Sequence, residues 1–319
     1  MTSSQSTRPA KIGLMLPAME KNNGMSSWAD IRAMAELAEG IGFDSLWVVD
    51  HFLYKLENDD PPKGAWECWS MLSALAACTK NVELGTLVLG MGFRNPALLA
   101  KMADTVDEIS GGRLILGIGA GYHKYEYDAF GYPFDYKFSR FEEGIQILHS
   151  LLKTGKVDFE GRFHSARDCE LKPRGPRPEG PPIMVGGRGH KMLRAVGRYA
   201  DIHNGFWDDV ANSPEGFAAM SARIDEACEE VGRDPATLAR SASVLIADPT
   251  AEPWWEDMPF DNDADLGALK PLFGEPEEIA DTLRRFVAEG VSSIQIHLDP
   301  TTPEAVERLA PVLEAFDAG

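Results

Sequence analysis

The feature that most constrains the fold of this chain is an eightfold alternation of short apolar runs and helical patterns. Each run of Val, Ile and Leu has the length of a buried strand, and each is followed by a segment with helical period. Such an alternation predicts a parallel sheet, and eight units predict a (β/α)₈ TIM barrel. We expect one domain over residues 1–319. The expected strands are 11–16, 45–49, 82–87, 113–117, 183–185, 201–204, 241–247 and 292–298.

The expected helices follow these strands in turn, and their ends carry recognisable signals. Asn95 can cap the third helix, Pro96 suits its first position, and Gly111 ends it. The helices are predicted at about 27–42, 67–78, 95–110, 138–152, 190–199, 214–231, 277–288 and 302–316.

Two long insertions interrupt the alternation, after strands four and seven. The first begins with the aromatic segment 122–137, for which no regular structure is predicted, and includes an expected hairpin over 156–171. The second, 251–273, is acidic and contains Trp254 and Trp255. Long βα loops in barrels are commonly lids or binding loops, so we expect a lid. Packing of its tryptophans on a neighbouring subunit is the alternative.

Composition and charge exclude several classes of protein. The formal net charge of −19 argues against nucleic acid as a partner, because phosphate binding needs a basic face. The polar N-terminus holds no secretory signal, and no apolar run approaches the length of a membrane span. The four cysteines show no ligand spacing, which is typical of reduced thiols. We therefore expect a cytoplasmic protein without a membrane or metal partner.

The residues at the ends of the expected strands are the candidates for chemistry, because all βα loops of a barrel meet at one face. Asp50 and His51 close the second strand, and a histidine at such a place is a natural proton donor or acceptor. A capping aspartate beside a structural histidine is the alternative. His203 and His297 end strands six and eight, and a structural role is favoured for both.

Glycines at two other strand ends indicate anion or ligand contact through the backbone. Gly119 and Gly121 belong to a Gly-x-Gly-x-Gly run, which either cradles a ligand or makes a tight turn. Gly186, Gly187 and Arg188 precede the fifth helix, where N–H groups and the helix dipole favour a phosphate.

Aromatic residues gather near the expected open face, either as packing on the rim or as a wall for a flat ligand. They are Trp66, Trp69, Tyr122, Tyr125, Tyr127, Phe130, Tyr132 and Phe134. Acidic clusters at 57–60 and 256–265 are interpreted as solvated loops rather than metal sites.

In combination these residues resemble the bacterial luciferase-like superfamily of flavin and deazaflavin oxidoreductases. Within it, the pattern is most similar to the branch that uses coenzyme F420, a deazaflavin that transfers hydride. The markers that carry this resemblance are LWVVDHF at 46–52, GTLV at 85–88, RNPALLAK at 94–101, SGGRL at 110–114, LGIGAGY at 116–122 and EYDAFG at 126–131.

The resemblance implies roles for the matching positions. Asp50 would contact the deazaflavin ring region, and His51 would be the catalytic residue that moves a proton of substrate or cofactor. Thr86, Leu87 and Val88 would line the cofactor, with a non-prolyl cis peptide at Leu87-Val88. Two further pairs complete the cofactor site: Gly119 and Gly121 after strand four, and Gly186 and Gly187, joined by Arg188, at the phosphate.

The chain also departs from the sugar-phosphate dehydrogenases of that branch. Tyr122 stands where they carry an acidic residue, and no tryptophan lies just beyond the DHF motif. These departures argue against sugar-phosphate oxidation. The tail of F420 is polyanionic, and the nearest cations to offset it are Lys137, Arg140, Arg188 and Lys191.

Four functions remain to be compared. The leading hypothesis is an F420-dependent oxidoreductase acting on a small organic substrate, and the second is an FMNH₂-dependent monooxygenase that uses O₂. A flavin or F420 reductase and a second copy of the chain in a homodimer are the expected partners. A flavin-binding barrel without turnover is a third hypothesis. A metal-dependent hydrolase is disfavoured, because no HxH or clustered His and carboxylate set lies on one strand.

Overall fold

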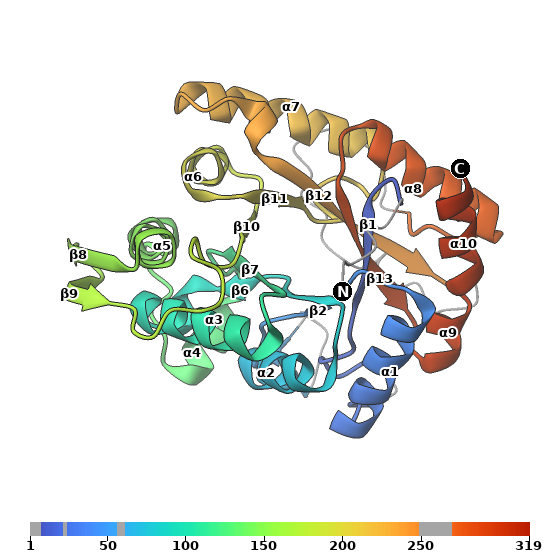
Figure 1. The fold of residues 1–319 in the computed structure, drawn as a ribbon, viewed down its shortest axis with the longest axis horizontal. Coiled ribbons are helices and arrows are strands. Elements are labelled where there is room, and N and C mark those ends of the chain that lie inside the picture. The colour runs from blue at the N-terminus through green and yellow to red at the C-terminus, as the bar shows by residue number, and fades with distance from the viewer. Residues whose placement is uncertain (1–7, 22–23, 56–60, 249–269) are drawn as a thin grey trace.

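Eight parallel strands close into a barrel in the computed structural model, which describes residues 8–21, 24–55, 61–248 and 270–319. Neighbouring strands pair in chain order, and β10 joins β7 while β13 joins β1, so that the ring is complete (Figure 1). The prediction of a (β/α)₈ barrel is confirmed. The strands are β1 (Lys11–Met15), β2 (Ser45–Val48), β5 (Glu83–Thr86), β7 (Leu114–Gly119), β10 (Ile183–Gly186), β11 (Ile202–Gly205), β12 (Ala239–Ala247) and β13 (Ser293–Asp299).

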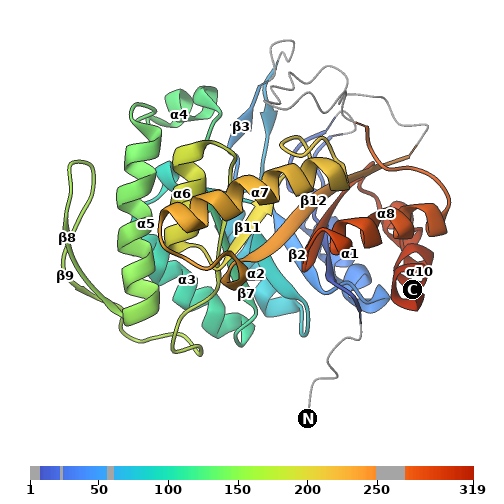
Figure 2. The same cartoon turned by 90° about the horizontal axis from the view of Figure 1, so that it is seen from above.

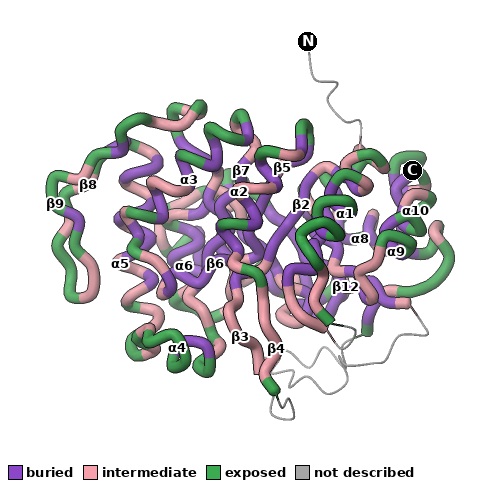
Figure 3. The backbone as a smooth tube through the Cα atoms, turned by 90° about the horizontal axis from the view of Figure 1, so that it is seen from below, coloured by how far each residue is buried: buried purple, intermediate pink, exposed green. Residues whose placement is uncertain are grey.

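Helices surround the barrel, and their outward faces are exposed while the strands are buried (Figure 3). The main apolar core therefore lies between the strands and the helix layer. The longer helices are α1 (Trp28–Ile41), α2 (Cys68–Cys78), α3 (Pro96–Ser110), α5 (Lys137–Thr154), α6 (His190–Tyr199), α7 (Pro214–Glu230), α8 (Pro276–Ala288) and α10 (Ala310–Ala318).

The ends of these helices follow from local sequence. Ser27 and Asp30 form a capping box at the start of α1, and Gly42 ends it in the left-handed region. Asn95 accepts hydrogen bonds from the first turn of α3, as predicted, with Pro96 as its first residue. Such caps satisfy backbone groups that the helix itself leaves without a partner.

A second, smaller apolar cluster fills the inside of the barrel. It consists of Met15, Trp47, Leu87, Ile115 and Met184. The Trp47 indole occupies the space that side chains at positions 13 and 85 would need, because a Cβ on either glycine would lie within 2.5 Å of the ring. Glycine on strands β1 and β5 therefore makes room for one large ring at the centre.

The first insertion contains more regular structure than the sequence indicates. The segment 122–137 holds a short helix, α4 (Lys124–Phe130), so the expectation of irregular chain there is wrong. The predicted hairpin is present as β8 (Lys156–Glu160) and β9 (Ser165–Glu170), which lie outside α5 (Figure 2). A further small hairpin follows β2 and consists of β3 (Leu53–Tyr54) and β4 (Lys63–Gly64).

The last predicted helix is divided in two. It begins at Thr302 as expected, but α9 (Pro303–Glu307) ends before α10 starts at Ala310. Pro311 explains the break, since a proline cannot donate the helical hydrogen bond and clashes with the preceding turn. The lid predicted over 251–273 lies, up to residue 269, outside the described residues.

Candidate functional site

The candidate site lies at the rim where the carboxyl ends of the barrel strands meet. Because every strand runs parallel, the residues after β2, β5, β7, β10 and β11 share this rim. The sequence-predicted residues therefore come together at one end of the barrel, although their side chains take different directions.

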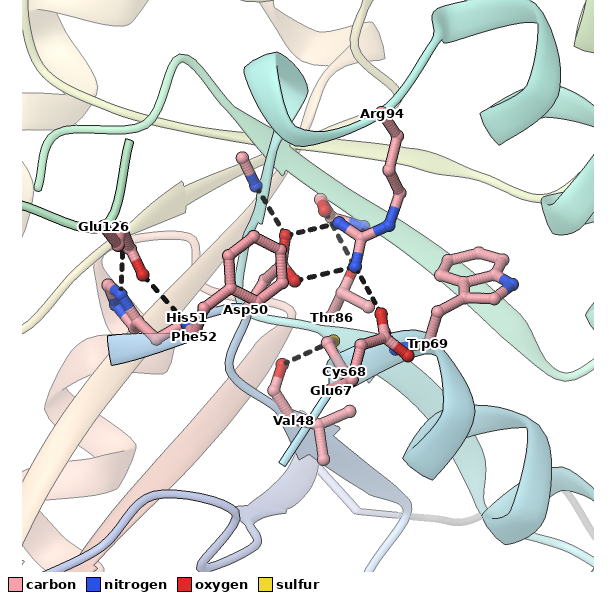
Figure 4. Close-up of polar contacts among 12 residues, drawn as sticks. Val48, Asp50, His51, Phe52, Glu67, Cys68, Trp69, Thr86, Arg94 and Glu126 are labelled. Carbon is pink, nitrogen blue, oxygen red and sulfur yellow. Dashed lines mark hydrogen bonds and ion pairs between the residues drawn. The ribbon is translucent and has the colours of Figure 1, made fainter. Parts of the chain in front are cut away.

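His51 forms an ion-pair contact with a residue that the sequence did not single out. Its Nδ1 lies 2.9 Å from Oε1 of Glu126, on α4, and the Glu126 side chain is 2% exposed (Figure 4). The other carboxylate oxygen accepts the backbone N–H of Phe52 at 2.9 Å. Since a carboxylate accepts, Nδ1 of the neutral imidazole carries the hydrogen, which leaves Nε2 available to take or give a proton.

The Nε2 atom of His51 faces Tyr122, whose hydroxyl lies 3.4 Å away. Burial of that hydroxyl raises the pKa of Tyr122 well above its ordinary value, and the phenol of Tyr54 and the carboxylate of Asp208 add to the shift. The residue nevertheless keeps 63% of its surface accessible. Tyr122 is therefore an exposed ring just beyond the end of β7, with its hydroxyl beside the imidazole of His51.

Asp50 points away from His51, into a buried charge cluster. Its two oxygens accept from Arg94 at 2.7 and 2.9 Å, and Oδ2 also accepts the N–H of Gly90 at 3.0 Å (Figure 4). Arg94 donates in addition to Glu67 at 2.6 Å. Burial raises the pKa of Asp50, and the bonds from Arg94 oppose that shift.

The predicted cis peptide is present between Leu87 and Val88, at the end of β5. Gly90, two residues beyond this bond, is the residue that Asp50 holds. Thr86 is fully buried, and its hydroxyl donates to the carbonyl of Gly117 at 2.7 Å and accepts from the N–H of Gly117 at 3.0 Å. Hydrogen bonds of Thr86 before the cis bond and of Asp50 after it thus hold this segment on both sides.

Val88 lies over two of the predicted glycines. A Cβ on Gly119 would lie 3.0 Å from Cγ2 of Val88, and one on Gly186 would lie 3.6 Å from the same side chain. Gly121 has a different role: its φ is +75°, and a Cβ there would lie 2.0 Å from the hydroxyl of Tyr127. The first two glycines thus clear the rim above β7 and β10, while Gly121 makes a turn.

Gly187 and Arg188 form the loop that leads into α6. Gly187 has a φ of +129°, and the N-cap Gly189 has no side chain to cap the helix. The Arg188 side chain lies 3.4 Å from Asp209, which follows β11. Burial, and then repulsion from Asp208, raise the pKa of Asp209, whereas Arg188 opposes the shift.

The other predicted cations lie along the starts of α5 and α6. Lys137 lies over the ring of Phe134, and Lys191 over that of Phe138. Arg140 donates to Asp135 at 2.9 Å. These positively charged side chains therefore lie on the part of the barrel rim next to β10.

The two strand-end histidines differ in burial, because His203 is fully buried whereas His297 is partly buried. Nε2 of His203 contacts the carbonyl of Gly187 at 3.2 Å, and burial lowers the pKa of His203 to about 4. His297 packs edge-on against Phe206 at 5.0 Å, and burial lowers its pKa to about 3. Both are neutral near pH 7, in keeping with the structural role that was favoured for them.

The aromatic residues divide between the two predicted roles. Trp69 and Tyr127 are buried in the packing, whereas Trp66, Tyr122, Tyr125 and Phe130 are exposed. A cavity of about 410 Å³ lies beside the charge cluster rather than at the mouth, and it is lined by Phe52, Ala65, Glu67, Phe93, Arg94, Phe130 and Tyr132. The predicted catalytic residue His51 and the predicted cofactor contact Val88 do not line this cavity. The rim of the barrel therefore remains the better candidate for the site of chemistry.

Within the described ranges, no three His, Cys, Asp or Glu side chains are grouped so as to hold a metal ion. In the same ranges, no helix has the length and apolar character needed to cross a bilayer.

Glu126 and Arg94 are the two site residues that sequence reasoning did not assign. Both stand inside motifs that carry the resemblance, at 126–131 and 94–101, and this is the signal that could have marked them. Their partners lie 75 and 44 positions away, so no local pattern reveals the contacts.

The barrel with this rim is that of the luciferase-like proteins. The family model for luciferase-like monooxygenases matches residues 9–264, and the chain belongs to that family. The predicted resemblance is thereby confirmed at the level of the family.

Among curated relatives, the pyrimidine monooxygenase RutA of Enterobacter cloacae is 33% identical over 244 residues. The aligned part covers 73% of this chain and 65% of that relative. RutA of Escherichia coli K12 is also 33% identical over 244 residues, with 73% and 62% covered. The chain thus spans less than two thirds of the length of these relatives.

Solved structures share the fold at lower identity. An F420-dependent secondary alcohol dehydrogenase in complex with an F420-acetone adduct has a TM-score of 0.79 at 20% identity, covering 96% of this chain and 99% of its own. The monooxygenase RslO1 from Streptomyces bottropensis has a TM-score of 0.73 at 22% identity, covering 97% and 98%. At these identities the likeness concerns the fold.

Proposed function

We propose that this protein is an F420-dependent oxidoreductase, which moves a hydride between the deazaflavin and a small organic substrate. The observation that carries the proposal is the pair of His51 and Glu126 at the barrel mouth. Transfer of a hydride to or from an oxygen-bearing carbon is accompanied by movement of a proton, and a buried carboxylate behind an imidazole is suited to that task.

The rim fits a flat cofactor with a phosphate. Gly119 and Gly186 leave the side chain of Val88 without competing Cβ atoms, which suits close approach of a planar ring. Gly187, Arg188 and the uncapped start of α6 would hold the phosphate. Once bound, the cofactor supplies or accepts the hydride.

The protein's own residues manage the proton. Glu126 fixes the imidazole through Nδ1, so Nε2 of His51 is the atom that can receive and return a proton. Tyr122, next to Nε2, can orient a substrate oxygen through its hydroxyl. Asp50 contacts neither His51 nor Tyr122, and we propose that it positions the segment with the cis bond at Leu87-Val88 through Gly90.

A second candidate function is that of an FMNH₂-dependent monooxygenase with a separate flavin reductase as partner. The observation that favours it is the 33% identity to relatives named as pyrimidine monooxygenases. In that case the substrate would be a nitrogen heterocycle and O₂ the co-substrate. The same rim residues would hold FMN through its ring and single phosphate.

Parallel titration of the apoprotein with F420 and with FMN, followed by fluorescence, separates the two functions. Tighter binding of F420, together with hydride exchange that proceeds without O₂, supports the proposal. Micromolar binding of FMN with none for F420, and O₂ consumption in the presence of a flavin reductase, would establish the monooxygenase instead. Cofactor binding without turnover on a panel of alcohols, ketones and heterocycles would point to a carrier.

A further inference from the structure

The loop at the proposed phosphate site is held from below by a side chain that has no other polar contact in the described residues. His203 is fully buried, and its Nε2 lies 3.2 Å from the carbonyl oxygen of Gly187. A carbonyl only accepts, so Nε2 carries the hydrogen and Nδ1 is the bare nitrogen. Nδ1 has no hydrogen-bond partner among the residues that the structure describes. The contact with Gly187 is thus the polar interaction that justifies a buried imidazole.

A second side chain holds the next carbonyl of the same loop. Nη2 of Arg223, on α7, donates to the carbonyl oxygen of Arg188 at 2.8 Å. Two successive carbonyls, from residues 187 and 188, are therefore drawn toward the layer between the barrel and α7. One is held by a strand residue and the other by a helix residue, so the restraint is independent of the loop itself.

The direction of these carbonyls decides the direction of two N–H groups. The peptides after Gly187 and Arg188 are absent from the cis bonds of the chain, and in a trans peptide the C=O and N–H point to opposite sides. Holding the carbonyl of Gly187 inward turns the N–H of Arg188 outward. Holding the carbonyl of Arg188 inward does the same for Gly189, at the start of α6.

The glycine at 187 makes this arrangement possible. Its φ of +129° is unfavourable for other residues, and a Cβ there would lie 2.9 Å from Cγ of Met192. Two outward N–H groups ahead of an uncapped helix form a concave set of donors suited to an anion. The donors belong to the backbone, but their aim depends on side chains from β11 and α7.

We propose that His203 and Arg223 are positioning residues, which aim the backbone N–H groups of residues 188 and 189 at the phosphate of the cofactor. This inference rests on the proposed function, because it takes the phosphate site at α6 from there. Neither side chain touches the phosphate. Each removes conformational freedom from the loop before binding, and such pre-organisation increases affinity for the phosphate alone.

The test compares cofactors that differ only in the phosphate-bearing tail: F420 against its phosphate-free deazaflavin chromophore, and FMN against riboflavin. Dissociation constants are measured by fluorescence for the wild type and for His203→Leu, His203→Gln, Arg223→Met and Arg233→Met. Glutamine keeps a donor at a similar reach, whereas leucine removes it. Arg233 donates to the carbonyl of Ala200 at the far end of α6, so its variant is the matched control.

We expect His203→Leu and Arg223→Met to weaken the phosphorylated cofactor about 5- to 20-fold, the usual value of one or two oriented hydrogen bonds. The phosphate-free chromophore should bind as to the wild type, and His203→Gln and Arg233→Met should keep the wild-type ratio. Arg223 lies near the surface, so its variant tests the inference even if His203→Leu does not fold.

Two results would overturn the inference. One is equal weakening of the phosphorylated and the phosphate-free cofactor, which indicates a general structural role. The other is an unchanged ratio of their dissociation constants in both His203→Leu and Arg223→Met. Failure of the proposed function looks different. Should FMN bind in place of F420, the F420 proposal fails while the FMN and riboflavin pair still reports on His203 and Arg223. If the wild type bound the phosphorylated and the phosphate-free forms equally well, the result would contradict both the phosphate site of the proposed function and this inference.

Discussion

Two sectors of the barrel rim, one after β2, β5 and β7 and the other after β10, present different chemical groups. After β2, β5 and β7, ionisable side chains are held in pairs, each with a buried carboxylate: His51 with Glu126, and Arg94 with Asp50. After β10, the groups proposed to bind ligand are backbone N–H groups, and the His203 side chain contacts the carbonyl of Gly187 beneath them. The first sector suits proton transfer, which needs titratable groups in fixed positions. The second suits recognition of a phosphate, which needs donors but no titration.

The largest effect is expected from removing the proton carrier of the first sector. His51→Ala should lower turnover about 10²- to 10⁴-fold, the usual contribution of general acid–base catalysis, with little change in the dissociation constant of the cofactor. Steady-state kinetics together with cofactor titration provide the measurement. Near-normal turnover in this variant would assign proton transfer to another residue.

Breaking the buried pair behind that sector should cost stability. Arg94→Met leaves the carboxylate of Asp50, which is fully buried, without its cation, and such a loss costs about 3–5 kcal/mol of unfolding free energy. Urea denaturation measures this change. The control is Arg32→Met, which removes an exposed pair with Glu36 and should cost far less stability, because solvent screens that pair. Equal costs in the two variants would contradict the buried character of the first pair.

Glu126→Gln tests whether the charge behind His51 matters or only its hydrogen bond. The amide oxygen can still accept from Nδ1, but the negative charge behind the ring is lost, so we expect turnover to fall about 10- to 100-fold. Asp128→Asn is the control, because Asp128 lies on the same helix in an exposed pair with Lys124. If both variants were equally active, Glu126 would be no more than a structural residue.

The second sector should respond in binding rather than in turnover. Gly187→Ala places a methyl group 2.9 Å from Met192 at a φ of +129°, so we expect the phosphorylated cofactor to bind about tenfold more weakly, as for one lost hydrogen bond. Turnover at saturating cofactor should stay near normal. Gly189→Ala is the control, since its φ is −68° and no atom lies within 4 Å of its Cβ position. A loss of turnover without a loss of binding would reverse the roles of the two sectors.

The smallest effect concerns pH. The pKa of Asp209 is raised in the folded protein, first by burial and then by Asp208, so the folded state holds a proton that the unfolded state has released. Stability should therefore fall as the pH rises from the ordinary carboxyl pKa toward neutrality. Asp209→Asn removes this dependence, and we expect a gain of about 1 kcal/mol at pH 7 relative to pH 5. Denaturation at both pH values measures it, and an unchanged slope would show that Asp209 titrates normally.

The sequence predicts features that rest on local rules. Helix caps such as Asn95 act within a few residues, and the strand pattern depends on apolar runs, so both were confirmed. The cis bond at Leu87-Val88 came from the motif resemblance and was also confirmed. Helix eight was predicted as one element, and the structure divides it at Pro311, a local signal that the apolar pattern obscured.

The sequence could not predict the direction in which each side chain at the site points. Asp50 and His51 are neighbours in the chain, yet one turns to Arg94 and the other to Glu126. Which way each turns depends on partners that reach the rim from α4 and from the segment before α3. Such contacts depend on the closure of the barrel, which no local pattern encodes.

The amino-acid sequence by itself determined the barrel and the family and predicted the rim as the location of the site, because these follow from periodicity and from short motifs. Only the tertiary structure decided that His51 is paired with a buried carboxylate and that Asp50 is paired with Arg94. It also placed His203 under the loop at Gly187. The physical reason is that hydrogen bonds and ion pairs depend on distance and orientation in space, which are fixed only when all eight strands close.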